Sequence, residues 1–106
     1  MTDSPLRITD HDAVRVITIH RPERLNALDS ATLDALHAAA DAAADDSAVR
    51  VVVLTGAGPK AFVAGADIAE MSGLTPAQGR DFALRGQRMM RRFERMSKPV
   101  IAMVNG

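Results

Sequence analysis

The sequence predicts an α/β fold in which helices cross over between strands that are mostly parallel. Three observations support this prediction: two short β-rich segments near the start, two helical segments with recognisable caps, and two apolar β-branched runs that each follow a helix. Strands that alternate with helices are typical of βαβ connections. A chain of 106 residues forms one domain at most.

The first two strands are expected at 6–9 and 14–20. The polar residues between them provide a tight connection, so the pair reads as a β-hairpin. In the second strand Val14, Val16 and the residues that flank Thr18 alternate with polar positions, which suggests one buried face.

A helix follows, and either Asp29 or Ser30 could cap its start. Its apolar positions recur at helical spacing, which predicts a slim inner face rich in alanine: Leu33, Leu36, Ala40 and Ala43 or Ala44. The next run, at 51–55, is continuously apolar and β-branched. Such a run is typical of a strand that is buried on both faces of a parallel sheet.

Thr75, Pro76 and Gln78 form the pattern of a capping box with proline in the first turn, so a second helix is expected from there to about Ser97. Its apolar positions again hold helical spacing: Phe82, Met89, Met90, Phe93 and Met96. The apolar run at 100–104 predicts another buried strand.

Composition excludes several classes of protein. Thirteen Lys and Arg balance thirteen Asp and Glu, and the pI is near 6.8, so a nucleic-acid partner is not expected. The absence of cysteine excludes disulfides and thiolate metal sites, and no segment resembles a signal peptide or membrane span. We therefore expect a cytoplasmic protein without membrane contact. Only three residues are aromatic, and so thin a core is easier to explain if other chain completes it, in cis or in trans.

The loop from Gly56 to Asp67 is the strongest candidate for a functional site. Its glycines permit unusual backbone, and Ala64, Gly65 and Ala66 leave little side chain between the main chain and a ligand. Asp67 would cap a short helix, whose free N–H groups could bind an anion or a carbonyl oxygen that becomes negative. Taken alone, these residues favour an ordinary turn and N-cap over an oxyanion site.

Two other motifs are weaker. Gly56, Gly58 and Ala61 match part of a dinucleotide fingerprint, but no amphipathic helix opens at the second glycine. Between Arg80 and Lys98, over the second helix and just past its end, there are seven basic and two acidic residues, and the basic face of the helix has no aromatic residue. This pattern favours a solvated face or a subunit contact over a phosphate or nucleic-acid surface. The three histidines have no partner at ligand spacing, so no metal is expected.

Three segments, HRPERLNAL at 20–28, VVVLTGAGPKAFVAGADIAEM at 51–71 and KPVIAMVNG at 98–106, resemble the N-terminal part of the enoyl-CoA hydratase/isomerase (crotonase) family. The resemblance implies that residues 1–106 form the N-terminal part of a crotonase-like domain. The fold would then be a partial spiral of ββα units, truncated before it is complete. It also implies an acyl-CoA thioester as substrate, coenzyme A only as part of that substrate, and trimers or hexamers of the full-length form.

The resemblance also implies roles for single residues. The Ala66 N–H would be one of two oxyanion donors, and Arg24 would contact a phosphate of CoA. The other residues expected along CoA are Leu25, Ala27, Ala64, Gly65, Asp67 and Ile68.

The family's second oxyanion amide and its acidic catalytic residues match no position here. An enoyl-CoA hydratase fragment, inactive by itself, is therefore the first interpretation. An isomerase parent and a non-catalytic interaction module are the alternatives.

Overall fold

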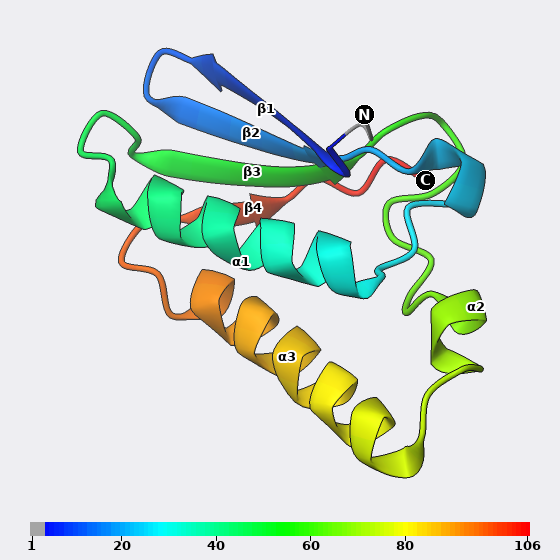
Figure 1. Ribbon diagram of the computed structural model, residues 1–106. Coiled ribbons are helices and arrows are strands. Elements are labelled where there is room, and N and C mark those ends of the chain that lie inside the picture. Colours follow the sequence, from blue (N-terminus) through cyan, green and yellow to red (C-terminus); the bar gives the residue numbers. More distant parts are fainter. Residues whose placement is uncertain (1–3) are drawn as a thin grey trace.

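The computed structural model describes residues 4–106 and places α1 between a four-stranded sheet and α3 (Figure 1). The elements are β1 (Leu6–His11), β2 (Val14–Ile19), the 3₁₀ helix η1 (Pro22–Arg24), α1 (Ser30–Asp45), β3 (Val51–Gly56), α2 (Ile68–Met71), α3 (Pro76–Glu94) and β4 (Val100–Ala102). The predicted α/β class is confirmed.

The strands lie in the order β1-β2-β3-β4. β1 and β2 pair antiparallel, from Leu6 opposite Ile19 to His11 opposite Val14, so the predicted hairpin is confirmed. β3 pairs parallel with β2 on one side and with β4 on the other. α1 and α3 therefore serve as the crossover helices of two successive parallel connections.

Only one face of the sheet is well covered within residues 4–106. Ile17, Ile19 and Val52 are almost fully buried against α1, because alternate residues of a strand point to the same face. Val14 and Val16 lie on the opposite face and are half-buried. The expectation that they share a buried face with the residues flanking Thr18 is wrong. The expectation that the 51–55 strand is buried on both faces holds only in part, since Val52 and Thr55 are buried but Val51, Val53 and Leu54 are half-buried.

The predicted inner face of α1 is confirmed. Leu33, Leu36, Ala40 and Ala43 are buried, and the Asp29 side chain caps the helix by accepting a hydrogen bond from Thr32 N. At the other end, Lys98 Nζ donates to the carbonyls of Ala43 and Asp46, both at 2.7 Å. A cation at a helix C-terminus satisfies carbonyls that have no partner inside the helix.

The capping box of α3 is confirmed by reciprocal bonds between Thr75 and Gln78, but the helix ends at Glu94, before the predicted Ser97. Of its expected inner positions only Met90 is wrong, because it is 57% exposed. The predicted buried strand at 100–104 is shorter and mostly exposed, since β4 lies at an edge of the sheet.

The charged faces of the two long helices meet each other. Arg85 pairs with Asp34 and Arg92 with Asp41, each at 2.6 Å. The basic face of α3 is therefore matched in part by the acidic face of α1, rather than being wholly solvated or reserved for a subunit. In the described part of the chain no helix is long and apolar enough to cross a membrane.

Candidate active site

Two segments far apart in the sequence, 25–28 and 64–67, run side by side as a short parallel ladder. Leu28 and Ala66 form its bridge. Leu28 N–H donates to the Gly65 carbonyl at 2.8 Å, and the Leu28 carbonyl accepts from Asp67 N–H at 2.8 Å. The ladder brings the two parts of the predicted site together.

The ladder fixes the direction of the Ala66 N–H. The Gly65 carbonyl and the Ala66 N–H belong to one planar trans peptide group, so they point in opposite directions. Because the carbonyl points at Leu28, the N–H points away from the ladder. Among residues 4–106 no group accepts a hydrogen bond from it, and Ala66 is exposed. This is a donor held in place with its acceptor position open.

Gly65 makes the turn into this ladder with φ +119°. A Cβ added at Gly65 would meet no atom within 4 Å, so the backbone angle, and not the space, requires glycine. Leu25 and Asn26 on the facing segment also have positive φ, 54° and 58°. Asparagine tolerates this conformation better than leucine. Leu25 is also 46% exposed.

Asp67 ends the ladder and begins α2, as predicted. Its Oδ1 accepts from Ala69 N at 3.0 Å and Glu70 N at 3.3 Å, while its Oδ2 lies 3.1 Å from the Arg21 guanidinium. The Glu70 N–H and then Arg21 hold the pKa of the Asp67 carboxyl below its ordinary value. Asp67 is thus an ionised, buried structural group.

Arg21 connects both sides of the ladder, although it was not among the residues predicted for the site. Its guanidinium donates to the Ala27 carbonyl and pairs with Asp67 at 3.1 Å and Asp29 at 3.3 Å. The Arg21 side chain is only 14% exposed. The partner Asp67 lies 46 residues away in the sequence, so no local pattern could have indicated this contact.

Two asparagine side chains hold the first part of the loop, 56–61. Asn26 is fully buried; its Oδ1 accepts from Arg21 N, and its Nδ2 donates to the carbonyls of Ala57 and Ala61, each at 2.9 Å. Asn105 accepts from Gly56 N at 3.1 Å and also donates to the Ala61 carbonyl, at 3.2 Å. Both residues belong to segments that carry the family resemblance, but neither was predicted to hold the loop.

The remaining predicted residues surround the ladder. Arg24 ends η1 and is exposed; Ala27 is half-buried, and Ala64 N–H donates to the Leu25 carbonyl at 3.1 Å. Ile68 is 80% exposed at the start of α2. The predicted set is therefore clustered in space, while the role of each member stays a prediction.

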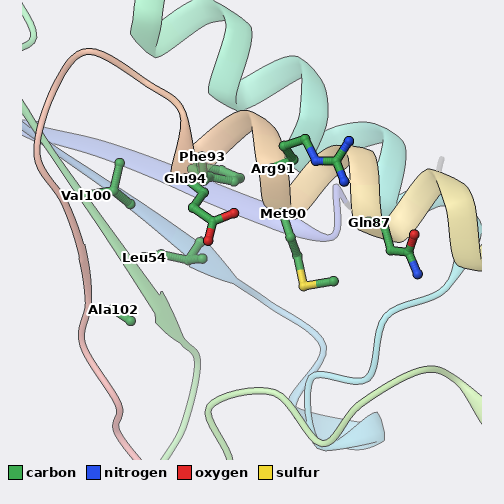
Figure 2. A pocket seen from close by; sticks show the side chains of 8 residues that line it. All are labelled: Leu54, Gln87, Met90, Arg91, Phe93, Glu94, Val100 and Ala102. Atoms are coloured by element: carbon green, nitrogen blue, oxygen red, sulfur yellow. The ribbon is translucent and has the colours of Figure 1, made fainter.

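Two hollows differ in their relation to this loop. One, of about 180 Å³, lies beside it and is lined by Pro22, Leu25, Asn26, Ala57, Gly58, Pro59, Lys60 and Ala61. The other, of about 530 Å³, lies between α3 and the strands β3 and β4 and shares no residue with the loop (Figure 2). Figure 2 shows Met90 and Gln87 extending from α3 on one side and Leu54, Val100 and Ala102 on the strand side.

In the part of the chain that the structure describes, no three His, Asp or Glu side chains lie close enough together to bind a metal ion. The dinucleotide interpretation also fails. Gly58 leads into a loop that continues to Asp67, and not into a helix that could receive a pyrophosphate.

Comparison with known proteins identifies relatives of this chain. The family model described as enoyl-CoA hydratase/isomerase matches residues 9–106. The short-chain-enoyl-CoA hydratase of Clostridium acetobutylicum is 50% identical over 93 residues, which are 88% of this chain and 36% of that protein. The crotonyl-CoA hydratase of Syntrophomonas wolfei is 46% identical over 95 residues, which are 90% of this chain and 36% of that protein.

Among solved structures, the enoyl-CoA hydratase from Bacillus anthracis superposes with a TM-score of 0.94 at 34% identity, over 96% of this chain and 40% of that one. The chain thus spans well under half the length of the relatives that it matches. The predicted crotonase-like fold is confirmed over that span. The family model, the similar sequences and the superposed fold agree, and the chain belongs to the enoyl-CoA hydratase/isomerase family.

Proposed function

We propose that this chain supplies the thioester-binding part of an enoyl-CoA hydratase site, with the Ala66 N–H as an oxyanion donor. The observation that carries the proposal is the N–H itself: it belongs to an exposed residue, its direction is fixed by the Leu28–Gly65 hydrogen bond, and it has no acceptor among residues 4–106. The names of the two similar hydratases supply the reaction class.

The chemistry gives such a donor a purpose. When water adds to C3 of a 2-enoyl thioester, electrons move to the thioester oxygen, and the resulting enolate then takes a proton at C2. A fixed N–H aimed at that oxygen stabilises the negative charge as it develops. Loss of one such donor costs about 10²–10³ in rate in other enzymes.

The carboxylates beside the loop have other partners, so we assign none of them as general base. Asp67 is paired with Arg21 and caps α2. Glu70 accepts hydrogen bonds from both the backbone N–H and the hydroxyl of Ser30. Because hydration needs positioned proton transfer as well as enolate stabilisation, we expect no turnover from the 106-residue chain alone.

The exposed residues around the ladder are suited to CoA. Leu25 and Ile68 offer apolar surface for adenine and pantetheine, and Arg24 offers a cation for a phosphate. CoA enters as part of the substrate, and the proposal needs no other cofactor. We further propose a cytoplasmic protein that forms trimers or hexamers in its full-length form. The exposed apolar residues on β4 and beyond it, Ile101, Met103 and Val104, support such contacts.

A titration of the isotope-labelled chain with crotonyl-CoA, followed by amide NMR, tests the proposal. We expect saturable shifts at 64–68 and at Leu25, and none at Ala77 in the first turn of α3. If residues 64–68 do not respond while the chain forms one defined oligomer by light scattering, the interaction-module alternative replaces the proposal.

Activity is tested in a hybrid enzyme, in which this chain replaces the segment that it matches in the C. acetobutylicum protein. We expect the hybrid to consume crotonyl-CoA and the isolated chain to consume none. Hydration by the isolated chain above the buffer rate would contradict the expectation that this chain alone has no general base.

A further inference from the structure

We propose that Arg21 is a positioning residue for the Ala66 N–H, and that it acts by bracing the ladder from both sides. The inference rests on the proposed function, since it concerns the same donor. The Arg21 guanidinium makes no hydrogen bond or ion pair with Ala66, so its effect must pass through its partners Ala27 and Asp67.

On the first side of the ladder, the Arg21 guanidinium donates to the Ala27 carbonyl, one residue before Leu28. Leu28 N–H then donates to the Gly65 carbonyl at 2.8 Å, and that carbonyl shares its peptide plane with the Ala66 N–H. Any rotation of the Ala27–Leu28 backbone therefore changes the direction of the donor.

On the second side, the guanidinium pairs with Asp67 Oδ2 at 3.1 Å, one residue after Ala66. Asp67 N–H donates to the Leu28 carbonyl at 2.8 Å, and Asp67 Oδ1 caps α2. One side chain thus holds the residue before Leu28 and the residue after Ala66. The donor lies between these two fixed points.

The charge balance explains why arginine stands here. Asp29, which caps α1, lies 3.3 Å from the same guanidinium, so two carboxylates share one cation. The side chains of Asp67 and Asp29 are 10% and 29% exposed, so water screens their repulsion poorly. The forked guanidinium divides these contacts between two nitrogens, with Nη1 donating to the Ala27 carbonyl and Nη2 facing both carboxylates, whereas an ammonium has a single nitrogen.

Arg15 supplies a matched control. Its side chain is 15% exposed and it also pairs with two carboxylates, Asp10 at 2.8 Å and Asp46 at 3.1 Å. It lies at the start of β2, at the opposite end from the loop. Arg15→Gln therefore removes a similar ionic cluster without touching the ladder.

Hydrogen exchange in the 106-residue chain is the first test, and it needs no substrate. In Arg21→Gln we expect the Leu28 and Asp67 amides to exchange at least about 10-fold faster, while the Val52 amide, in the core of the sheet, keeps its protection. Arg15→Gln should leave all three amides unchanged. Unchanged protection of the Leu28 amide overturns the proposal. An equal loss of protection at Val52 also overturns it, because Arg21 would then stabilise the whole fold and not the ladder in particular.

The kinetics of the hybrid enzyme are the second test. Arg21→Gln should lower kcat for crotonyl-CoA by about 10- to 100-fold and change KM by less than about 3-fold, because a displaced donor weakens binding of the transition state more than binding of the substrate. Arg21→Lys should recover part of kcat through the Asp67 pair. A kcat equal to that of Arg15→Gln, or no recovery with lysine, contradicts the inference.

The Ala66 donor and the positioning role of Arg21 can be refuted independently of each other. If removal of the Ala66 N–H leaves kcat unchanged while the exchange result holds, the brace exists but the donor assignment is wrong. If that removal lowers kcat and Arg21→Gln does not, the donor assignment stands and Arg21 has no positioning role.

Discussion

Replacement of Asn26 by alanine should cost the fold far more stability than replacement of Asn105, although both amides hold the same loop. Asn26 is 0% exposed, and its side chain makes three hydrogen bonds of 2.9 Å, to Arg21 N and to the carbonyls of Ala57 and Ala61. Asn105 makes a comparable set but is only half-buried.

The magnitude follows from burial. Each hydrogen bond contributes about 0.5–1.5 kcal/mol, and a buried group left unpaired costs about 1–3 kcal/mol. Asn26→Ala should therefore lower the free energy of unfolding by about 3–5 kcal/mol. Asn105→Ala should cost about 1 kcal/mol, since water can reach the groups that it leaves. Asn26 also has φ 58°, so Asn26→Gly should cost about 1 kcal/mol less than Asn26→Ala.

Urea unfolding followed by circular dichroism measures these differences. The expected order of destabilisation is Asn26→Ala, then Asn26→Gly, then Asn105→Ala. If Asn26→Ala and Asn105→Ala lower the free energy of unfolding by amounts that agree to within about 0.5 kcal/mol, burial does not determine how strongly these side chains stabilise the loop. If glycine and alanine at position 26 are equally stable, the positive φ carries no cost.

Three further predictions concern the loop and the helices. Gly65→Ala should lower the free energy of unfolding by about 1–3 kcal/mol, because the backbone there has φ +119°. Gly79→Ala in α3 should raise it by about 0.5–1 kcal/mol, and neither new methyl group meets an atom within 4 Å. Urea unfolding that gives the reverse order refutes the backbone argument. Because the pKa of Asp67 is lowered, its ionised carboxylate stabilises the fold fully above about pH 4, and this contribution is lost as pH falls through the folded-state pKa. Asp67→Asn should therefore flatten the acid limb of a curve of unfolding free energy against pH. An unchanged acid limb contradicts this prediction. Arg92→Ala should cost at most about 1 kcal/mol, and less in 1 M salt, because its partner Asp41 is half exposed; a larger, salt-independent loss would mean that the pair is not a surface one.

Local signals in the sequence predicted the helices well. Asp29, Asp67 and the Thr75–Gln78 capping box all begin the helices that they were expected to begin. Such caps act within three or four residues, so their partners are visible in the sequence itself.

Burial was predicted less well, because it depends on which neighbour covers a face. Val14 and Ile17 are both apolar and β-branched, and only the position of α1 decides that Ile17 is the buried one. Ile101 belongs to an apolar run but is 53% exposed, since β4 has a neighbour on one side only among the described residues. Met90 fits the helical period of α3, yet it lies just beyond the edge of the buried stripe.

The geometry of the site depends on contacts between distant segments. The cap at the start of α2 was predictable from Asp67, although Asp67 itself accepts hydrogen bonds from Ala69 N and Glu70 N, so these N–H groups are not free for a ligand. The partners that orient Ala66 were not predictable. Arg21 lies 46 residues before Asp67 in the sequence, and the fold alone brings the two together. Asn26 likewise gains its role from a loop that begins about thirty residues later.

The most direct test of the central claim removes the Ala66 N–H without changing the side chain. An ester in place of the Gly65–Ala66 amide, made by incorporating the α-hydroxy analogue of alanine into the hybrid enzyme, replaces that N–H by an oxygen. An ester at Ala77, whose N–H also has no acceptor among residues 4–106, is the control. We predict that kcat for crotonyl-CoA falls by about 10²–10³ for the ester at Ala66 and is unchanged for the ester at Ala77. Equal kcat values for the two esters would contradict the claim.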